Sequence, residues 1–267
     1  MKVEASHVTA KEYITGLAAS GRYHFSSAEA RSAIGVSAAA AKLALNRLSK
    51  QGAVASPARG FYVIVPPEYR SLACLPADQF VPSLMQRLGL SDYACLLSAA
   101  QYHGAAHHRP QEFQVMVPKN RRAIQCGAVR VVFVARKRLR DVSVQEFNTP
   151  RGPIRVTTPE ATAVDLAGYT HRAGGLGQVA TILAELAEKI DPNKLAAAAK
   201  TAPIPWAQRL GYLLARVGAG EKTAALKAYV RSHARDSTML LNSARRGRAR
   251  RDPDWKLYVN TRVQAEL

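Results

Sequence analysis

The sequence predicts an α+β fold in two parts, a small helical unit over residues 1–67 and a larger mixed α/β domain over residues 68–267 with a small sheet and several helices. Three observations lead to this prediction. Near the N-terminus, apolar residues recur at helical spacing between capping signals. Between residues 113 and 156, apolar and polar residues alternate in three segments, as is typical of strands. Helical spacing then returns for most of the remaining chain.

The first two helices are predicted from apolar spacing and from caps. Residues 9–20 bring four apolar side chains to one helical face, namely Tyr13, Ile14, Leu17 and Ala18. Ser26 and Glu29 follow with the spacing of a capping box, in which each side chain accepts a hydrogen bond from the other residue's amide. Ala30 and Ile34 are the expected core residues of this second helix, and Gly35 is expected to end it.

A third helix and a hairpin complete the N-terminal unit. Residues 38–50 place Ala41, Leu45 and Leu48 on one face, and Gly52 follows as a helix stop. Strands are expected at 53–56 and 61–65, on either side of a turn made by Pro57-Ala58-Arg59-Gly60. Helix, turn, helix and hairpin in this order are typical of a winged helix-turn-helix.

The outward side of the third helix is the predicted DNA-reading surface, because early residues of a recognition helix meet base edges and flanking cations meet phosphates. Asn46 can pair with an adenine edge and Lys42 with a guanine, while Arg59 at the hairpin turn can reach the minor groove. The predicted DNA-binding residues are Ser37, Ala38, Ala39, Lys42, Asn46, Arg47, Lys50 and Arg59. Alanines read little beyond a thymine methyl, so one unit should have modest specificity. The alternative is a protein-interaction module whose cations are merely solvated.

The charge of the whole chain points to the same kind of partner. Lys and Arg number 38 against 19 Asp and Glu, a formal net charge of +19. Such an excess favours a polyanion such as double-stranded DNA, since each phosphate contact releases condensed counterions. The alternative is that the charge only reflects a genome rich in Arg codons.

Cysteine usage and hydropathy predict a cytoplasmic protein. Cys74, Cys95 and Cys126 are far apart in the sequence and form no CxxC motif, which suits buried thiols in a reducing compartment better than disulfides or zinc. No apolar run approaches the roughly 20 residues that span a bilayer, so no membrane partner is expected. Met1-Lys2-Val3-Glu4 does not resemble the start of a signal peptide.

The second part is expected to begin with a linker at 68–76 and two helices at 78–88 and 91–103. Strands are predicted at 113–117, 129–134 and 154–156. Pro159 suits the first turn of the helix that follows Thr158. The further predicted elements are helices at 177–189, 193–200, 205–217 and 221–233 and a last strand at 255–260.

Two segments of this second part carry a family resemblance. One is Tyr93-Ala94-Cys95-Leu96-Leu97-Ser98-Ala99-Ala100, leading into His103-Gly104, and the other is Val156-Thr157-Thr158-Pro159-Glu160-Ala161-Thr162-Ala163-Val164-Asp165-Leu166. Together with the N-terminal pattern they resemble the AbiEi family of antitoxins, from abortive-infection systems that defend against phage. The resemblance implies a winged helix that represses its own operon at inverted repeats. It also implies a C-terminal domain that counters a nucleotidyltransferase-like toxin. The family offers no motif for toxin-contacting residues.

Two basic runs lie outside the N-terminal unit. The first runs from Lys119 to Arg140 without a carboxylate, and the second from Arg245 to Arg251. They are predicted to extend the DNA footprint or to hold an acidic face of the toxin or its RNA substrate, although a solvated surface is the alternative. Their cations are Lys119, Arg121, Arg122, Arg130, Arg136, Lys137, Arg138, Arg140, Arg245, Arg246, Arg248, Arg250 and Arg251.

Enzyme chemistry and metal binding are not expected. Glu160 and Asp165 are five residues apart and so do not share a helical face; we expect Glu160 in a first helical turn and Asp165 in a cap or pair. His103, His107 and His108 have no nearby carboxylate or cysteine to complete a metal site. The run Gly174-Gly175-Leu176-Gly177 lacks the Lys-Ser/Thr of a P-loop and is expected to be a helix-entry turn. No cofactor is predicted.

Three functional hypotheses remain. The first is a DNA-binding autorepressor that doubles as the antitoxin of a phage-defence pair. The second is a plain winged-helix regulator or architectural DNA binder without a toxin. The third is a nuclease, which needs paired acids and a lysine on adjacent strands to hold magnesium; the acid-poor strands argue against it. The operator, the oligomeric state and the mode of neutralisation are not determined by the sequence.

Overall fold

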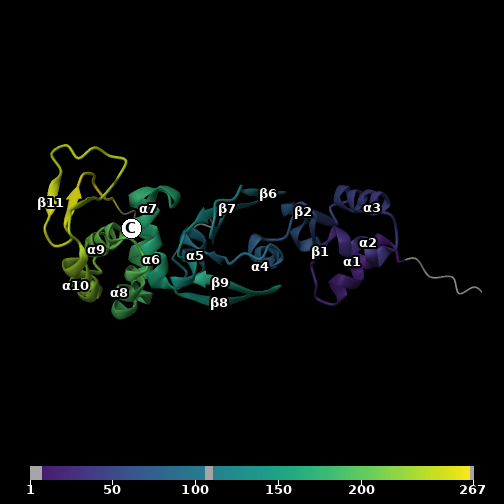
Figure 1. Cartoon of the computed structure of the whole chain (residues 1–267), viewed down its shortest axis with the longest axis horizontal. Helices are drawn as coiled ribbons and strands as arrows, with labels where there is room; N and C mark the ends of the chain where they lie inside the picture. Colours follow the sequence, from purple (N-terminus) through teal and green to yellow (C-terminus); the bar gives the residue numbers. More distant parts are fainter. Residues whose placement is uncertain (1–7, 106–110, 265–267) are drawn as a thin grey trace, which may run out of the picture.

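The computed structural model describes residues 8–105 and 111–264. The chain forms an elongated α+β molecule, with the N-terminal helices at one end, a sheet and α4 in the middle, and a helical region at the other end (Figure 1). The last strands lie beyond those helices (Figure 1). Among the described residues, no helix is long and apolar enough to cross a membrane.

Three capped helices form the N-terminal end, as predicted: α1 (Ala10–Ala19), α2 (Ser27–Ile34) and α3 (Ala38–Lys50). Thr9, Ser26 and Ser37 are their N-caps, and the first two make complete capping boxes with Glu12 and Glu29. Gly35 lies in the left-handed region at φ 70°, which allows the chain to turn sharply between α2 and α3.

A three-stranded sheet packs on these helices and differs from the prediction in two ways. Its strands, in the order β1-β3-β2, are β1 (His24–Ser26), β3 (Phe61–Ile64) and β2 (Val54–Ala58). Strand β1 was not predicted, because three residues before a capping box carry too little pattern. The hairpin turn is also shorter than predicted: a β-bulge between Ala55 and Ala58 carries β2 past Pro57. The core beneath joins Ile14, Phe25, Leu45 and Val54 with neighbouring apolar residues.

The prediction of a linker over residues 68–76 is wrong. This segment forms a 3-10 helix (Pro67–Leu72) followed by Cys74 and Leu75, whose side chains are 0% and 1% exposed. Phe61 and Val63 of the hairpin share a core with these two residues and with α4 (Ala77–Arg87). The hairpin therefore packs against helices α1–α3 on one side and against the second part of the chain on the other.

A six-stranded mixed sheet forms the middle of the molecule, in the order β6-β7-β5-β4-β9-β8. The predicted helix over 91–103 is corrected here, since Tyr93 and Ala94 form the short strand β4 between β5 and β9 and the helix α5 begins only at Leu96. Buried pairing on both sides outweighs the helical pattern of these residues. The strands are β4 (Tyr93–Ala94), β5 (Phe113–Val117), β6 (Ile124–Cys126), β7 (Val129–Ala135), β8 (Val144–Thr149) and β9 (Gly152–Thr157), and α5 is Leu96–Tyr102.

The helical region follows the sheet and agrees closely with the predicted helices. Its core joins Leu166, Leu183, Leu195, Leu210 and Leu226, each 0% exposed. The helices are α6 (Pro159–Gly168), α7 (Gly175–Leu186), α8 (Pro192–Lys200), α9 (Ile204–Arg216) and α10 (Ala224–His233), with 3-10 turns at Thr170–Arg172, Ala187–Lys189 and Gly220–Thr223. A further 3-10 turn, Leu139–Asp141, lies between β7 and β8 of the sheet.

A second small sheet closes the C-terminal end in the order β10-β12-β11. Trp255, which was expected in the last strand, instead precedes it in a turn and is buried against α9. Gly211 makes this contact possible, since a Cβ there would lie 2.0 Å from Trp255 Cζ3. The strands are β10 (Thr238–Met239), β11 (Arg250–Asp252) and β12 (Leu257–Val259).

All three cysteines are free and buried, as predicted. Cys74 and Cys126, however, are not far apart in space. The thiol of Cys74 donates a hydrogen bond to that of Cys126, which raises the pKa of Cys74 and lowers that of Cys126.

Candidate functional site

The outward face of α3 is the first candidate site. The predicted residues Ser37, Ala38, Ala39, Lys42, Asn46, Arg47 and Lys50 are all exposed, and so is Arg59 in the hairpin turn. The opposite face, with Ala41, Leu45 and Leu48, is buried. Ser37 also has a structural task, because its Oγ accepts a hydrogen bond from the Ala40 amide at 3.2 Å and so caps the helix. The arrangement exposes two lysines, two arginines and an amide, which can meet a partner.

Sequence reasoning missed Leu43 on this face. Its side chain is 60% exposed, the largest value among the exposed large hydrophobic residues of the described chain. Leu43 stands four residues after Ala39 and three before Asn46, so all three point the same way. The signal that could have found it is this spacing, which puts Leu43 on the same helical face as the predicted residues. An exposed leucine beside a hydrogen-bonding amide suits contact with a thymine methyl group.

An ion pair fixes the entry to α2. Arg22 pairs with Glu29, whose carboxylate also accepts a hydrogen bond from the Ser26 amide at 2.7 Å. Partial burial alone would raise the pKa of Glu29, but these hydrogen bonds, with that of the Ser26 hydroxyl, lower it to about 2. Burial lowers the pKa of the neighbouring His24, and Arg22 lowers it further. The ion pair therefore joins Arg22, just before β1, to the first turn of α2.

Most of the predicted second basic patch is exposed. Arg246 lies over the Tyr258 ring with Cζ 3.9 Å from its centroid, and Arg251 Nε donates to Ser237 Oγ at 3.0 Å. Arg130 is partly neutralised, since its Nε lies 2.5 Å from Glu112 Oε1, just outside the run that lacks carboxylates. The exposed members are Lys119, Arg121, Arg122, Arg130, Lys137, Arg138, Arg140, Arg245, Arg246, Arg248, Arg250 and Arg251.

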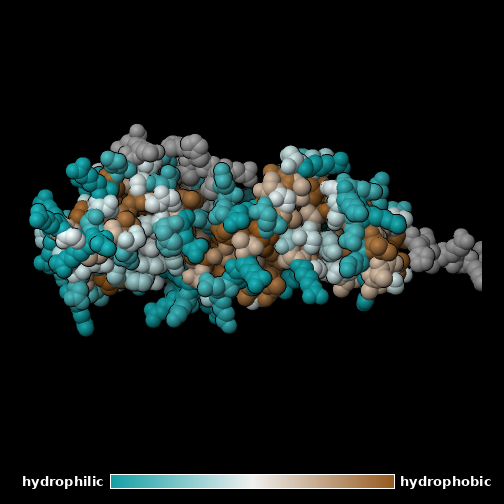
Figure 2. All heavy atoms as spheres, turned by 90° about the horizontal axis from the view of Figure 1, so that it is seen from above, coloured by the Kyte–Doolittle hydropathy of each residue, from teal (hydrophilic) through white to brown (hydrophobic). Residues whose placement is uncertain are grey.

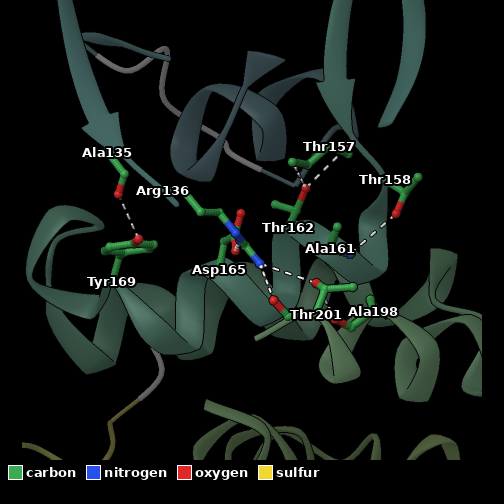
Figure 3. Close-up of polar contacts among 10 residues, drawn as sticks. All are labelled: Ala135, Arg136, Thr157, Thr158, Ala161, Thr162, Asp165, Tyr169, Ala198 and Thr201. Atoms are coloured by element: carbon green, nitrogen blue, oxygen red, sulfur yellow. Dashed lines mark hydrogen bonds and ion pairs between the residues drawn. The ribbon is translucent and has the colours of Figure 1, made fainter. Parts of the chain in front are cut away.

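Arg136 is the exception, and its assignment to a surface patch is wrong. Its side chain is only 7% exposed and forms an ion pair with Asp165 of α6, which is 0% exposed. Arg136 Nη2 also donates to the backbone oxygen and the hydroxyl of Thr201, both at 3.3 Å. Figure 3 shows the guanidinium pointing into the space between α6 and Thr201. Arg136 thus joins the end of β7 to two helices, and the prediction that Asp165 pairs within the fold is confirmed.

Burial governs the protonation of this pair. Removal from water raises the pKa of Asp165 to about 6, against the lowering effect of Arg136. Asp165 Oδ2 has no hydrogen-bond partner among the described residues, which adds to the cost of ionising the carboxyl group. Arg136 keeps its charge: desolvation lowers its pKa, but the attraction and hydrogen bond of Asp165, together with Tyr93 and Tyr169, outweigh this effect and raise it.

The Thr-Thr-Pro-Glu segment before Asp165 is a structural junction. Thr158 caps α6 by accepting from the Ala161 amide at 3.3 Å, while the hydroxyls of Thr157 and Thr162 lie 2.7 Å apart (Figure 3). Glu160, in the first turn of α6 as predicted, is buried and accepts from the Asp191 amide at 3.0 Å. This segment, one of the two that carry the family resemblance, therefore connects β9, α6 and α8.

The remaining polar candidates also have structural roles. His103 is 4% exposed, and its Nε2 lies 2.7 Å from the Thr157 backbone oxygen; burial lowers its pKa. His107 and His108 lie outside the described residues. Gly174 is the N-cap of α7 in the left-handed region, so the glycine run is a helix-entry turn as predicted. Within the described chain, no group of three or more His, Cys, Asp and Glu side chains is arranged to hold a metal ion.

Comparison with known proteins defines first the class of fold and then the family. The crystal structure of the RV2827C protein from Mycobacterium tuberculosis matches 93% of this chain and 90% of its own, with a TM-score of 0.65 and 17% sequence identity. The chain thus has an α+β fold that is found in a solved structure. Residues 93–216 match the family model of the AbiEi antitoxin C-terminal domain. This match confirms, for this part of the chain, the resemblance found in the sequence.

No curated protein matches the chain at a significant level. The matched range, 93–216, begins at β4 and ends at the last residue of α9. It contains both Arg136 and Asp165, so the buried ion pair lies within the matched range, whereas the α3 surface lies outside it.

Proposed function

We propose that this chain is a DNA-binding autorepressor and the antitoxin of a toxin–antitoxin pair. In this proposal residues 1–67 are a winged helix-turn-helix, with α3 as the recognition helix and β2–β3 as the wing. The observation that carries the DNA-binding half is the outward face of α3, where Lys42, Asn46 and Leu43 are exposed together while the opposite face is buried. A helix with cations, an amide and an apolar contact on one face suits the major groove.

The antitoxin half rests on the family match. An AbiEi antitoxin C-terminal domain over residues 93–216 implies a toxin as its partner, and we propose that the toxin resembles a nucleotidyltransferase. The proposed operator is the chain's own promoter, with inverted repeats that bind two copies, since a single recognition helix that begins with alanines reads few bases. Phage defence is the expected role of the pair.

The exposed basic patch, now without Arg136, is proposed to extend the DNA contact along the backbone. Its cations stand outside α3: one group lies at the β6–β7 side of the large sheet, where β6 contacts the wing strand β2, and the other lies around β11 at the opposite end of the molecule (Figure 1). The face seen in Figure 2 carries hydrophilic residues along its whole length. At least six phosphate contacts would give a salt dependence steeper than about −5 in log K against log salt, from roughly −0.9 per contact.

The test is an electrophoretic shift of the full chain on DNA from upstream of its gene, against scrambled DNA, over a salt series. Preferential binding near physiological salt supports an autorepressor. Equal and steeply salt-dependent binding to both DNAs contradicts sequence-specific repression and favours an architectural DNA binder.

Point variants in the full chain test the recognition helix. Lys42→Ala and Asn46→Ala are each expected to weaken operator binding by about 1–3 kcal/mol, because each removes a base contact. Lys194→Ala is the matched control: it removes one exposed charge on α8, at the other end of the molecule (Figure 1). Unchanged affinity in both α3 variants, or an equal loss in the control, would refute the assignment of α3.

A further inference from the structure

A cavity of about 470 Å³ opens beside the Arg136–Asp165 pair, within the range that matches the antitoxin family model. Its walls come from the end of β7, from Tyr169 after α6, and from the chain between Lys200 and Trp206. We propose that this cavity binds a nucleotide, with the base on Trp206 and the phosphate on the lysines and arginine at its rim. The proposal goes beyond the proposed function: it shares Lys137 and Arg138 with the exposed basic patch, but it involves no residue of α3 and no double-stranded DNA.

The aromatic wall of the cavity is held in a fixed position. Tyr169 and Trp206 meet edge to face, with ring centroids 4.8 Å apart. Trp206 lies directly against Gly168 of α6, where a Cβ would come within 2.2 Å of the indole Cδ2. Tyr169 donates from its hydroxyl to the Ala135 backbone oxygen at 3.3 Å (Figure 3). A partly exposed indole whose back is fixed by close packing offers a ready face for stacking a base.

The rim of the cavity is positive. Lys137, Arg138 and Lys200 are exposed, and none of them takes part in the ion pairs found among the described residues. Arg136 behind them already has Asp165 and Thr201 as partners, so its task is to hold β7 against the helices. No carboxylate is among the described residues that line the cavity. The rim therefore has free charge for an anion.

Two other cavities of similar size lack this combination. One, of about 490 Å³ beside α4 and α5, is lined by Asp78 and Glu112. The other, of about 500 Å³ near β11, has arginines but also Asp252, and no tryptophan. A flat apolar face together with free cations is the chemistry that recognises a base joined to a phosphate. The nucleotide can be free or can be part of a single strand, and the experiment separates these sources.

The experiment titrates the full chain with ATP, inorganic triphosphate and a 5′-phosphorylated single-stranded oligonucleotide, using calorimetry and tryptophan emission. ATP is expected to bind saturably and to quench emission, and inorganic triphosphate is expected to bind at least roughly tenfold more weakly because it cannot stack. Tighter binding of the oligonucleotide identifies a strand as the ligand, and equal or weaker binding identifies a free nucleotide.

Variants locate the site. The double variant Lys137→Ala/Lys200→Ala changes only exposed residues and is expected to weaken ATP binding by roughly tenfold or more. Trp206→Phe is expected to retain most of the affinity, whereas Trp206→Ala is expected to lose it. The control is Arg121→Ala, which removes an exposed cation outside the cavity and is expected to leave the affinity for ATP unchanged.

Three results would overturn the proposal: no saturable ATP binding, equal affinity for inorganic triphosphate, or ATP binding that the double lysine variant leaves unchanged. The Lys42→Ala variant separates this proposal from the proposed function. It is expected to impair operator binding and to leave ATP binding intact, so that either proposal can fail without the other.

Discussion

The outward face of α3 and the Arg136–Asp165 pair use basic side chains in opposite ways. On α3, Lys42, Arg47 and Lys50 extend into solvent. Arg136, in contrast, is 7% exposed and spans from β7 to a fully buried Asp165 on α6. The first arrangement leaves charge available to a partner, and the second uses charge to join a sheet to helices. A basic run in a sequence therefore does not reveal which of its cations meets a ligand; burial decides that.

The largest expected effect comes from breaking the buried pair. Asp165→Ala leaves the Arg136 guanidinium buried without its counter-charge, and we expect the free energy of unfolding to fall by about 3–5 kcal/mol. Urea denaturation followed by circular dichroism measures it. Lys137→Ala, the exposed neighbour, is expected to stay within about 0.5 kcal/mol. A similar loss of unfolding free energy in both variants would mean that the buried ion pair stabilises the fold no more than an exposed cation does.

A second prediction contrasts glycine packing at the two ends of the molecule. Gly211→Ala puts a Cβ 2.0 Å from Trp255 Cζ3, and we expect a loss of about 1–3 kcal/mol or more because the indole must move. Gly16→Ala, in α1, meets nothing within 4 Å and should gain about 0.5–1 kcal/mol from helix propensity. Thermal melts of the two variants show whether each substitution raises or lowers the melting temperature. A higher melting temperature for Gly211→Ala would contradict the close contact with Trp255.

The smallest expected effect on stability comes from breaking the Arg22–Glu29 ion pair at the start of α2. Glu29 has a pKa of about 2 against an ordinary value of 4.5, so it contributes stability that is present above pH 4.5 and is lost as the pH falls through 2. Glu29→Gln is expected to cost less than about 1 kcal/mol at pH 7, since the pair with Arg22 is partly exposed. Acid titration of both proteins should show this difference vanish near pH 2. A difference that persists there would rule out the ion pair as its cause.

Local signals in the sequence predicted much of the N-terminal helices. The Ser26–Glu29 capping box, the Gly35 stop and the buried face of α3 all follow from interactions within a few residues, which the sequence states directly. The same holds for Thr158 as the cap of α6. Leu43 shows the limit of local signals: the helical spacing puts it on the exposed face, whereas its apolar character predicts burial, and it is exposed in the structure.

Non-local contacts account for the wrong predictions. Residues 68–76 have the composition of a linker, yet Cys74 and Leu75 are buried because the hairpin and α4 enclose them. Tyr93 and Ala94 have a helical pattern but pair with β5 and β9, which come later in the chain. The burial of Arg136 depends on Asp165, 29 residues away. No local window contains such partners.

By itself, the sequence determined the α+β class, the caps and faces of most helices, the excess of positive charge and the resemblance to AbiEi antitoxins. The tertiary structure alone decided that the hairpin packs on both parts of the chain, that Arg136 is buried while its basic neighbours are exposed, and that Trp206 meets Tyr169 beside free lysines. The physical reason is the sequence distance over which each interaction acts. Capping and helix periodicity act over a few residues, whereas burial depends on which distant segments remove a side chain from water.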